Sequence, residues 1–110
     1  MIWCDHMYIG KQCRVGHKKM QDRITNGRVH PCVFLIALPQ SEHAVLEIIP
    51  SMLLLQENYP RDGLRIAGMA ATRQEALRLA EQMIAECFRV RQDADVSAYM
   101  EQLQTRGCEV

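Results

Sequence analysis

The chain has 110 residues, of which 48% are hydrophobic and 24% are charged, and its formal net charge at pH 7 is zero. This composition excludes a fibrous or disordered chain, and the length predicts a single α/β domain over residues 1–110 with one hydrophobic core. The longest apolar runs fall far short of the roughly 20 residues of a membrane span, and no basic-then-apolar leader opens the sequence, so a cytoplasmic protein is expected.

The distribution of charge and the number of cysteines bear on possible partners and on the redox state of the thiols. The first 31 residues carry six Lys or Arg against two Asp, a net charge of +4, and the remaining residues carry a net −4. Such asymmetry suits an acidic partner or the association of oppositely charged faces. Five cysteines without an export signal indicate reduced thiols, with Cys32 and Cys87 expected in the core because their neighbours are apolar.

The first third of the chain predicts a strand followed by a short helix. Residues 2–9 contain β-formers interrupted by Asp5 and His6, which favours an edge strand. A helix is expected over residues 17–25, packed by a narrow stripe that includes Met20 and Ile24, and Asn26-Gly27 is a typical stop signal.

The middle of the chain predicts a central strand and a second helix. Residues 32–38 form the most apolar run and end at Pro39, which indicates the middle of a sheet. Ser41 is a suitable N-cap for a helix that continues to Leu55 and is either kinked or split at Pro50, with a kink preferred. Apolar side chains cover so much of that helix that a second buried face is expected, and a dimer contact is predicted there, formed by Met52, Leu53, Leu54 and Leu55.

The last part predicts a buried strand and two helices. A strand from Leu64 to Met69 should lie inside the sheet, and Thr72 with Glu75 matches a capping box that begins a helix extending to Arg91. The helix is expected to pack on the sheet by one apolar stripe, formed by Ala76, Leu77, Ala80, Met83, Ile84, Cys87 and Phe88. Asp95 is the expected N-cap of a final helix that stops at Gly107.

Alternating strands and helices predict βαβ units. The expected fold is therefore α/β, a small three-stranded mainly parallel sheet of order 1-2-3 with crossover helices and an extra C-terminal helix. Because so small a sheet leaves one face hard to cover, this fold again favours a homodimer.

Four runs together, YIG before the Lys-rich segment, VFLIALP, LEIIPSMLLLQ and LRIAGMAATRQEAL, resemble a family of small bacterial proteins of unknown function. They span most of the chain. The resemblance implies no catalytic or binding residue.

Two ligand sites are conceivable from residue types. Zinc donors occur at Cys13, His17, His30 and Cys32, but the spacing lacks a C-x-x-C pair, so scattered side chains are the simpler interpretation and no cofactor is expected.

An anion could bind at the helix starts, at Ser41, Thr72 and Arg73. The turn has a single glycine rather than G-x-G-x-x-G, so Gly68 is better explained by close packing of helix on strand.

A basic segment is the remaining candidate, with six cationic residues, Lys11, Arg14, Lys18, Lys19, Arg23 and Arg28. With the whole chain neutral, a solvated helix face is favoured over nucleic-acid binding.

No motif of a known enzyme class is present in the sequence, although a catalytic Cys and His that come together only in the folded chain stay an open alternative. The leading hypothesis is a non-enzymatic, self-associating interaction or regulatory module, and the alternative is a small-anion or nucleic-acid binder.

Overall fold

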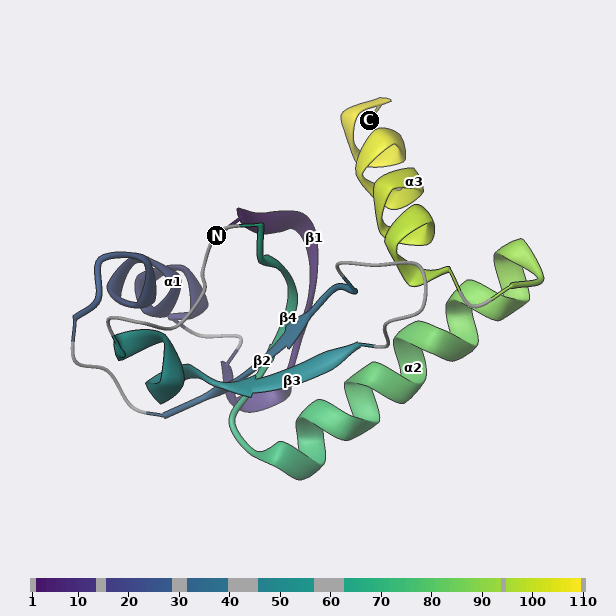
Figure 1. Ribbon diagram of the computed structural model, residues 1–110. Coiled ribbons are helices and arrows are strands. Elements are labelled where there is room, and N and C mark those ends of the chain that lie inside the picture. The colour runs from purple at the N-terminus through teal and green to yellow at the C-terminus, as the bar shows by residue number, and fades with distance from the viewer. Residues whose placement is uncertain are drawn as a thin grey trace.

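The computed structural model describes residues 2–13, 16–28, 32–39, 46–56, 63–93 and 95–109, with side chains up to residue 102 except that of Asp5. These segments contain four strands, three α-helices and two short 3₁₀ helices. The strands are β1 (Ile2–Ile9), β2 (Phe34–Ala37), β3 (Glu47–Pro50) and β4 (Arg65–Ala70) (Figure 1). The helices are α1 (His17–Thr25), α2 (Arg73–Arg91) and α3 (Val96–Glu109), with the 3₁₀ helices η1 (Lys11–Cys13) and η2 (Ser51–Leu55). Within the described segments, no helix has both the length and the apolar character that crossing a bilayer requires.

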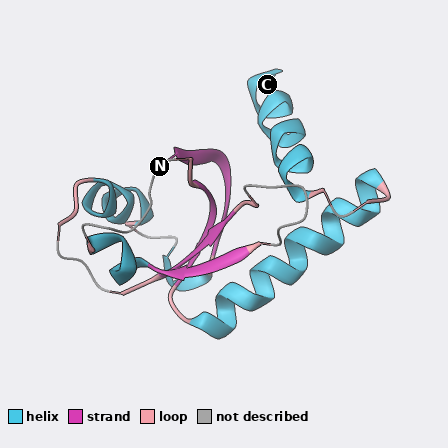
Figure 2. Ribbon diagram, in the orientation of Figure 1, coloured by secondary structure: helices cyan, strands magenta, loops and turns pink. Residues whose placement is uncertain are grey.

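The strands form one mixed sheet of order β1-β4-β2-β3 (Figure 2). Only β1 and β4 are parallel, whereas β2 is antiparallel to both β4 and β3. The predicted three-stranded, mainly parallel sheet of order 1-2-3 is therefore wrong. The individual placements of β1 at an edge and of β2 and β4 inside the sheet are confirmed.

The error arises at β3, which occupies residues predicted to be helical. Ile48 pairs with Ile36 and Ile49 with Leu35, so this part of the chain returns beside β2 instead of crossing over as a helix. Ser51 N donates to Val33 O at 2.8 Å, so Val33 and Ser51 form a hydrogen-bonded pair. Because such pairs alternate along an antiparallel ladder, the neighbouring Phe34–Pro50 pair is a non-hydrogen-bonded one, and Pro50 needs no N–H there. Proline is thus tolerated as the last residue of an edge strand rather than as a helix kink; residues 41–45 of the predicted helix lie outside the described residues.

Two hydrophobic clusters cover the two faces of the sheet. On one face α2 and α3 pack over a cluster that includes Ile36, Ala67 and Met100. On the other face α1, η1 and η2 contribute Ile24, Cys13 and Leu54 to a second cluster. The sheet is therefore the middle layer between helices on both sides (Figure 1).

Gly68 lies where β4 is most closely packed between its neighbours. A Cβ at this position would lie 2.9 Å from Ile36 Cδ1 and 3.0 Å from the Tyr8 carbonyl oxygen. The glycine therefore accommodates the two flanking strands, not the helix that the sequence suggested.

Helix α2 begins as predicted, with Thr72 as its N-cap, but it packs by only half of the predicted stripe. Ala76, Ala80, Met83 and Cys87 are buried, whereas the other three members, Leu77, Ile84 and Phe88, are exposed by 45%, 41% and 57%. At about 100° per residue the two sets lie roughly a quarter turn apart, so one helix cannot bury both on the same sheet face. The single broad stripe expected from the sequence is in fact two narrower ones.

The shorter helices largely follow their sequence signals. Helix α1 spans the predicted residues, buries Ile24 and ends with Gly27 at φ 66°, and Trp3 Nε1 of β1 donates to Thr25 Oγ1 at its last turn (2.9 Å). Helix α3 begins after Asp95, whose Oδ1 accepts from Ala98 N (3.1 Å), but it continues past Gly107 to Glu109. The predicted stop at Gly107 is wrong because a glycine only weakens a helix, by about 1 kcal/mol.

Candidate functional site

The N-terminus of α2 was predicted to help bind an anion through Thr72 and Arg73. Thr72 Oγ1 accepts from Glu75 N (3.1 Å), and Glu75 Oε1 accepts from Ala71 N (3.1 Å). The reciprocal bond of the capping box therefore reaches Ala71, one residue earlier than expected. A side chain at Gly10 would collide with this same carboxylate, so Glu75 fills the space between the ends of β1 and β4.

The chain's own carboxylate thus stands where an external anion would approach this helix. Negative charge near a helix N-terminus is stabilising, and Glu75 supplies it from within the molecule. Thr72 and Arg73 are both exposed beside it, and the third predicted contact, Ser41, lies outside the described residues. Anion binding at these residues stays a prediction, now with a competing carboxylate in place.

The predicted zinc donors are brought together only in part. Cys13 is buried in η1 and Cys32 is exposed just before β2, yet both line one pocket together with Met20 and Met69. Half-buried His17 is the first residue of α1, and His30 lies outside the described residues. Among the side chains that the structure describes, no three His, Cys, Asp or Glu residues are grouped to hold a metal ion.

No disulfide joins the four cysteines whose side chains are described, Cys4, Cys13, Cys32 and Cys87. Cys87 is in the core as predicted, whereas the prediction for Cys32 is wrong because the strand begins only at Phe34. Burial raises the pKa of the Cys13 thiol, and the nearby Glu75 carboxylate raises it further. Burial likewise raises the pKa of Cys87, helped by Asp93. Both shifts disfavour the thiolate, which is the nucleophilic form of cysteine.

The basic segment lies on the surface around α1. The predicted cations that the structure describes are exposed there, namely Lys11, Lys18, Lys19, Arg23 and Arg28, while Arg14 lies outside the described residues. Asp22 is also exposed on α1 and interrupts the positive charge. Exposure suits a solvated helix face and a phosphate-binding surface equally, so nucleic-acid binding stays a prediction, testable by retention on heparin as salt is raised.

A half-buried polar contact joins β1 to α2. Tyr8 Oη donates to Glu86 of α2, whose other oxygen accepts from Gln82 Nε2 (3.1 Å), and Tyr99 of α3 is close enough to add to the raised pKa of Tyr8. Burial and the Glu86 carboxylate hold the pKa of Tyr8 well above its ordinary value. This contact determines which side of α2 faces β1. The sequence pattern did not predict it.

The segment predicted as a dimer contact is η2, directly after the edge strand β3. Leu54 is fully buried in the chain's own core, Leu53 and Leu55 are half-buried, and Met52 is 46% exposed. Of the four predicted residues, Leu54 is thus already buried within one chain, and Met52 is the most exposed and therefore the most available for contact with a second copy. The exposed stripe of α2 adds three further apolar side chains, Leu77, Ile84 and Phe88.

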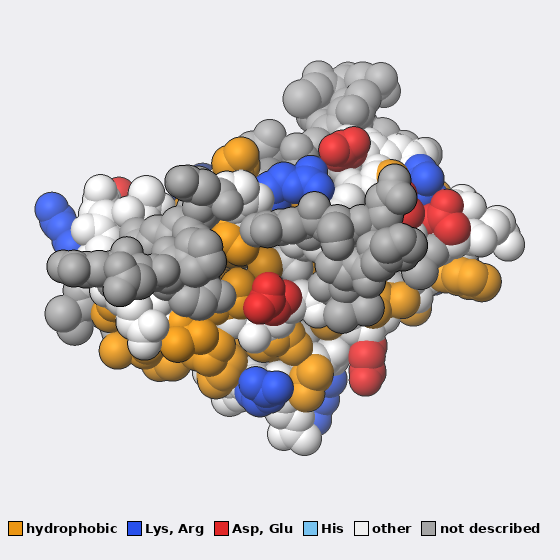
Figure 3. Space-filling view, in the orientation of Figure 1, with side chains coloured by type: hydrophobic (Ala, Val, Ile, Leu, Met, Phe, Trp, Pro, Cys, Tyr) orange, Lys and Arg blue, Asp and Glu red, His pale blue; other side chains and the backbone are white. Residues whose placement is uncertain are grey.

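These side chains lie near β3, an edge strand of the sheet formed by the described residues, with Met52 at one face of the sheet and the stripe of α2 at the other. Glu86, which faces β1, lies two residues from both Ile84 and Phe88, about 200° around the helix. The exposed stripe therefore points away from β1, toward the side of the sheet that ends in β3. Figure 3 shows hydrophobic side chains over η2 and along α2 on one face of the molecule. We call Met52, Leu77, Ile84 and Phe88 the edge face.

Comparisons with protein-family models, with curated proteins and with solved structures found no match for this chain. The resemblance to small bacterial proteins therefore stays a prediction from the sequence.

Proposed function

We propose that this chain is a self-associating interaction module rather than an enzyme, and that two copies meet through the edge face. The observation that carries the proposal is the exposure of three large apolar side chains in a row on α2, Leu77, Ile84 and Phe88. Scattered apolar residues are ordinary on a protein surface, but three large exposed apolar side chains on one side of a helix beside an edge strand are typical of an interaction site.

A second copy of the chain suits this surface. A two-fold dimer needs a patch that is complementary to itself, and an apolar stripe satisfies that condition because each side chain meets another apolar group. Glu81 lies within the stripe, between Leu77 and Ile84, and Arg73 and Arg78 are exposed on the same helix, so a second copy would meet charges of both signs there. With zero net charge, two copies also approach without overall repulsion.

The expected affinity is modest. Leu77, Ile84 and Phe88 keep about half of their surface exposed, so covering each one contributes about 1 kcal/mol. Six such side chains in a dimer, with Met52 from each copy, contribute about 8 kcal/mol, which is of the same order as the association cost of about 4–15 kcal/mol. A reversible dimer is therefore expected, not a subunit contact that never opens.

The test is to place charge on the stripe and compare it with charge elsewhere on α2. In sedimentation velocity, the double variant Ile84→Glu with Phe88→Glu should be monomeric at concentrations where wild type is dimeric. Val90→Glu is the matched control, because Val90 is 45% exposed on α2 but lies off the stripe. Circular dichroism checks that both variants keep the wild-type helix content.

Three outcomes would count against the proposal. A wild-type chain that remains monomeric would remove self-association and leave a different protein partner for the edge face. A double variant as dimeric as wild type would show that the contact lies elsewhere. Equal disruption by Val90→Glu would show that the effect is not specific to the stripe.

A further inference from the structure

A pocket of about 220 Å³ opens at one end of the sheet. The parallel strands β1 and β4 both end there, and the antiparallel strand β2 begins there. The residues after β1 contribute Gln12 and Cys13, the end of β4 contributes Met69 and Ala71, and Val33 precedes β2. Carboxyl ends of parallel strands are where ligands usually bind in α/β proteins.

Among the residues that the structure describes, no side chain fills this space, which is open to solvent on one side. An apolar cavity of about 150 Å³ is large enough to hold benzene. The pocket is therefore of a size that takes a molecule with one or two small rings.

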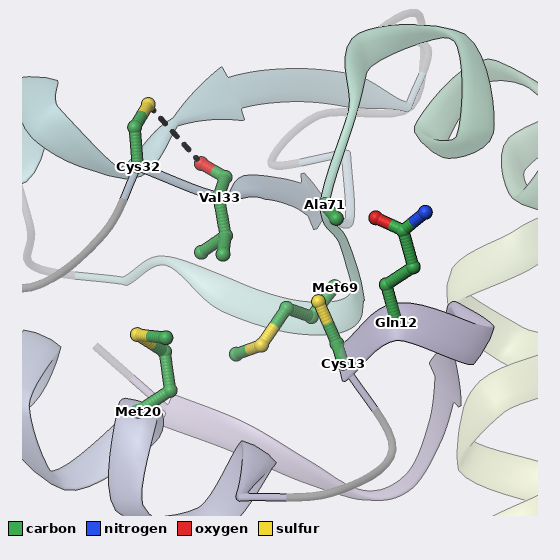
Figure 4. A pocket seen from close by; sticks show the side chains of 7 residues that line it. All are labelled: Gln12, Cys13, Met20, Cys32, Val33, Met69 and Ala71. Carbon is green, nitrogen blue, oxygen red and sulfur yellow. Dashed lines mark hydrogen bonds between the residues drawn. The ribbon is translucent and has the colours of Figure 1, made fainter.

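Sulfur gives the pocket its chemical character. Figure 4 shows Cys13, Met20 and Met69 directed into the same space from η1, α1 and β4. The thiol of Cys32 points away from them at the rim, toward the Val33 carbonyl oxygen at 3.9 Å. Divalent sulfur makes favourable contacts with aromatic ring edges, so an aromatic ring suits this lining better than an alkyl chain.

The surroundings select for a neutral ligand. Ala71 lines the pocket, and its N–H is already taken by the Glu75 carboxylate. An ion of either sign would leave water for a lining of carbon and sulfur with little to solvate it. Among the described lining side chains, Gln12 supplies an amide that both donates and accepts hydrogen bonds.

We propose that this pocket binds a small uncharged aromatic molecule, with its ring against Cys13, Met20 and Met69 and one polar substituent toward Gln12. Such a site is independent of self-association through the edge face.

Indole is a suitable probe, because it is an uncharged aromatic with a single N–H donor. In spectra of protein labelled with ¹³C at the methionine methyl groups, indole should shift Met20 and Met69 saturably, with a dissociation constant on the order of a millimolar. Met83 and Met100, in the core cluster on the other face of the sheet, are internal controls and should not move. Nuclear Overhauser contacts from indole to the Met20 and Met69 methyl groups should accompany the shifts.

Two comparisons sharpen the test. Indole-3-carboxylate has the same ring with a negative charge and should bind at least tenfold more weakly. Ala71→Leu should fill the pocket and weaken indole binding at least tenfold, whereas Ala85→Leu, an exposed alanine of α2, should leave binding unchanged. Shifts that do not saturate, that are equal at Met83, or that survive Ala71→Leu would overturn the proposal; the Overhauser contacts in wild type keep it testable even if that variant unfolds.

Discussion

Removing the Glu75 carboxylate tests whether this side chain serves as the internal anion of α2. In Glu75→Ala, Ala71 N loses its 3.1 Å hydrogen bond, and the helix N-terminus loses a negative charge. A hydrogen bond to a charged group contributes about 1.5–3 kcal/mol and the charge at a helix end about 0.3–1 kcal/mol. Because Glu75 is only half-buried, the lower part of this range applies, and a loss of about 2 kcal/mol in the free energy of unfolding is expected.

Two further variants separate the hydrogen bond from the charge. Glu75→Gln keeps an oxygen acceptor and loses only the charge, so its cost should be about 0.5–1 kcal/mol. Glu81→Gln removes the same charge from an exposed position on the same helix and should stay within about 0.3 kcal/mol of wild type.

Urea unfolding followed by far-ultraviolet circular dichroism at 25 °C measures all three variants. Glu75→Ala with a stability equal to that of Glu81→Gln would refute the assignment, because it would mean that neither the bond nor the charge at the α2 start contributes. A loss equal in Glu75→Gln and Glu75→Ala would assign the whole effect to the charge.

Two other predictions concern titrating groups in the folded chain. Tyr8→Phe should cost about 1 kcal/mol at pH 7 by removing the bond to Glu86. Because the folded-state pKa of Tyr8 is raised, its stabilising contribution is complete below the ordinary tyrosine pKa of about 10 and is lost as the pH rises further. Urea titrations at pH 7 and above pH 10 should thus show a steeper alkaline loss in wild type than in Tyr8→Phe; equal losses would contradict the linkage. Iodoacetamide should modify exposed Cys32 before Cys13 and Cys87, whose thiols are buried and have raised pKa values. Peptide mapping over time checks the order, and a Cys13 rate equal to that of Cys32 would contradict the buried placement.

Local signals in the sequence predicted the elements whose structure is decided locally. Thr72 and Glu75 predict the start of α2, Asn26-Gly27 the end of α1, and the run before Pro39 an interior strand, and all three are confirmed. Each depends on hydrogen bonds or backbone preferences within a few residues.

The strand order could not be derived in the same way. The short apolar run before Pro50 is compatible with a helix or a strand, and its pairing with Leu35 and Ile36 decides between them. That pairing joins residues more than ten positions apart. Once β3 forms a hairpin with β2, the parallel βαβ arrangement predicted from alternating elements is impossible.

The candidate sites also combine residues that the sequence pattern indicates with an arrangement that only tertiary packing decides. The apolar residues of α2 are evident in the sequence, but which of them face the sheet depends on packing, where Ala76 and Ala80 allow close approach and Leu77, Ile84 and Phe88 stay outside. The pocket draws its walls from four separate segments, around Cys13, Met20, Val33 and Met69. The sequence contains no spacing signal for such a site, because its residues meet only through the sheet.

The mass of the wild-type chain in solution tests self-association most directly. One chain has a mass of 12.6 kDa. Sedimentation equilibrium over a range of micromolar concentrations should give a mass that rises toward twice this value and fits a monomer–dimer equilibrium. A mass that stays at that of one chain through the highest concentration would contradict the account, since the exposed stripe of α2 would then have no second copy to cover it.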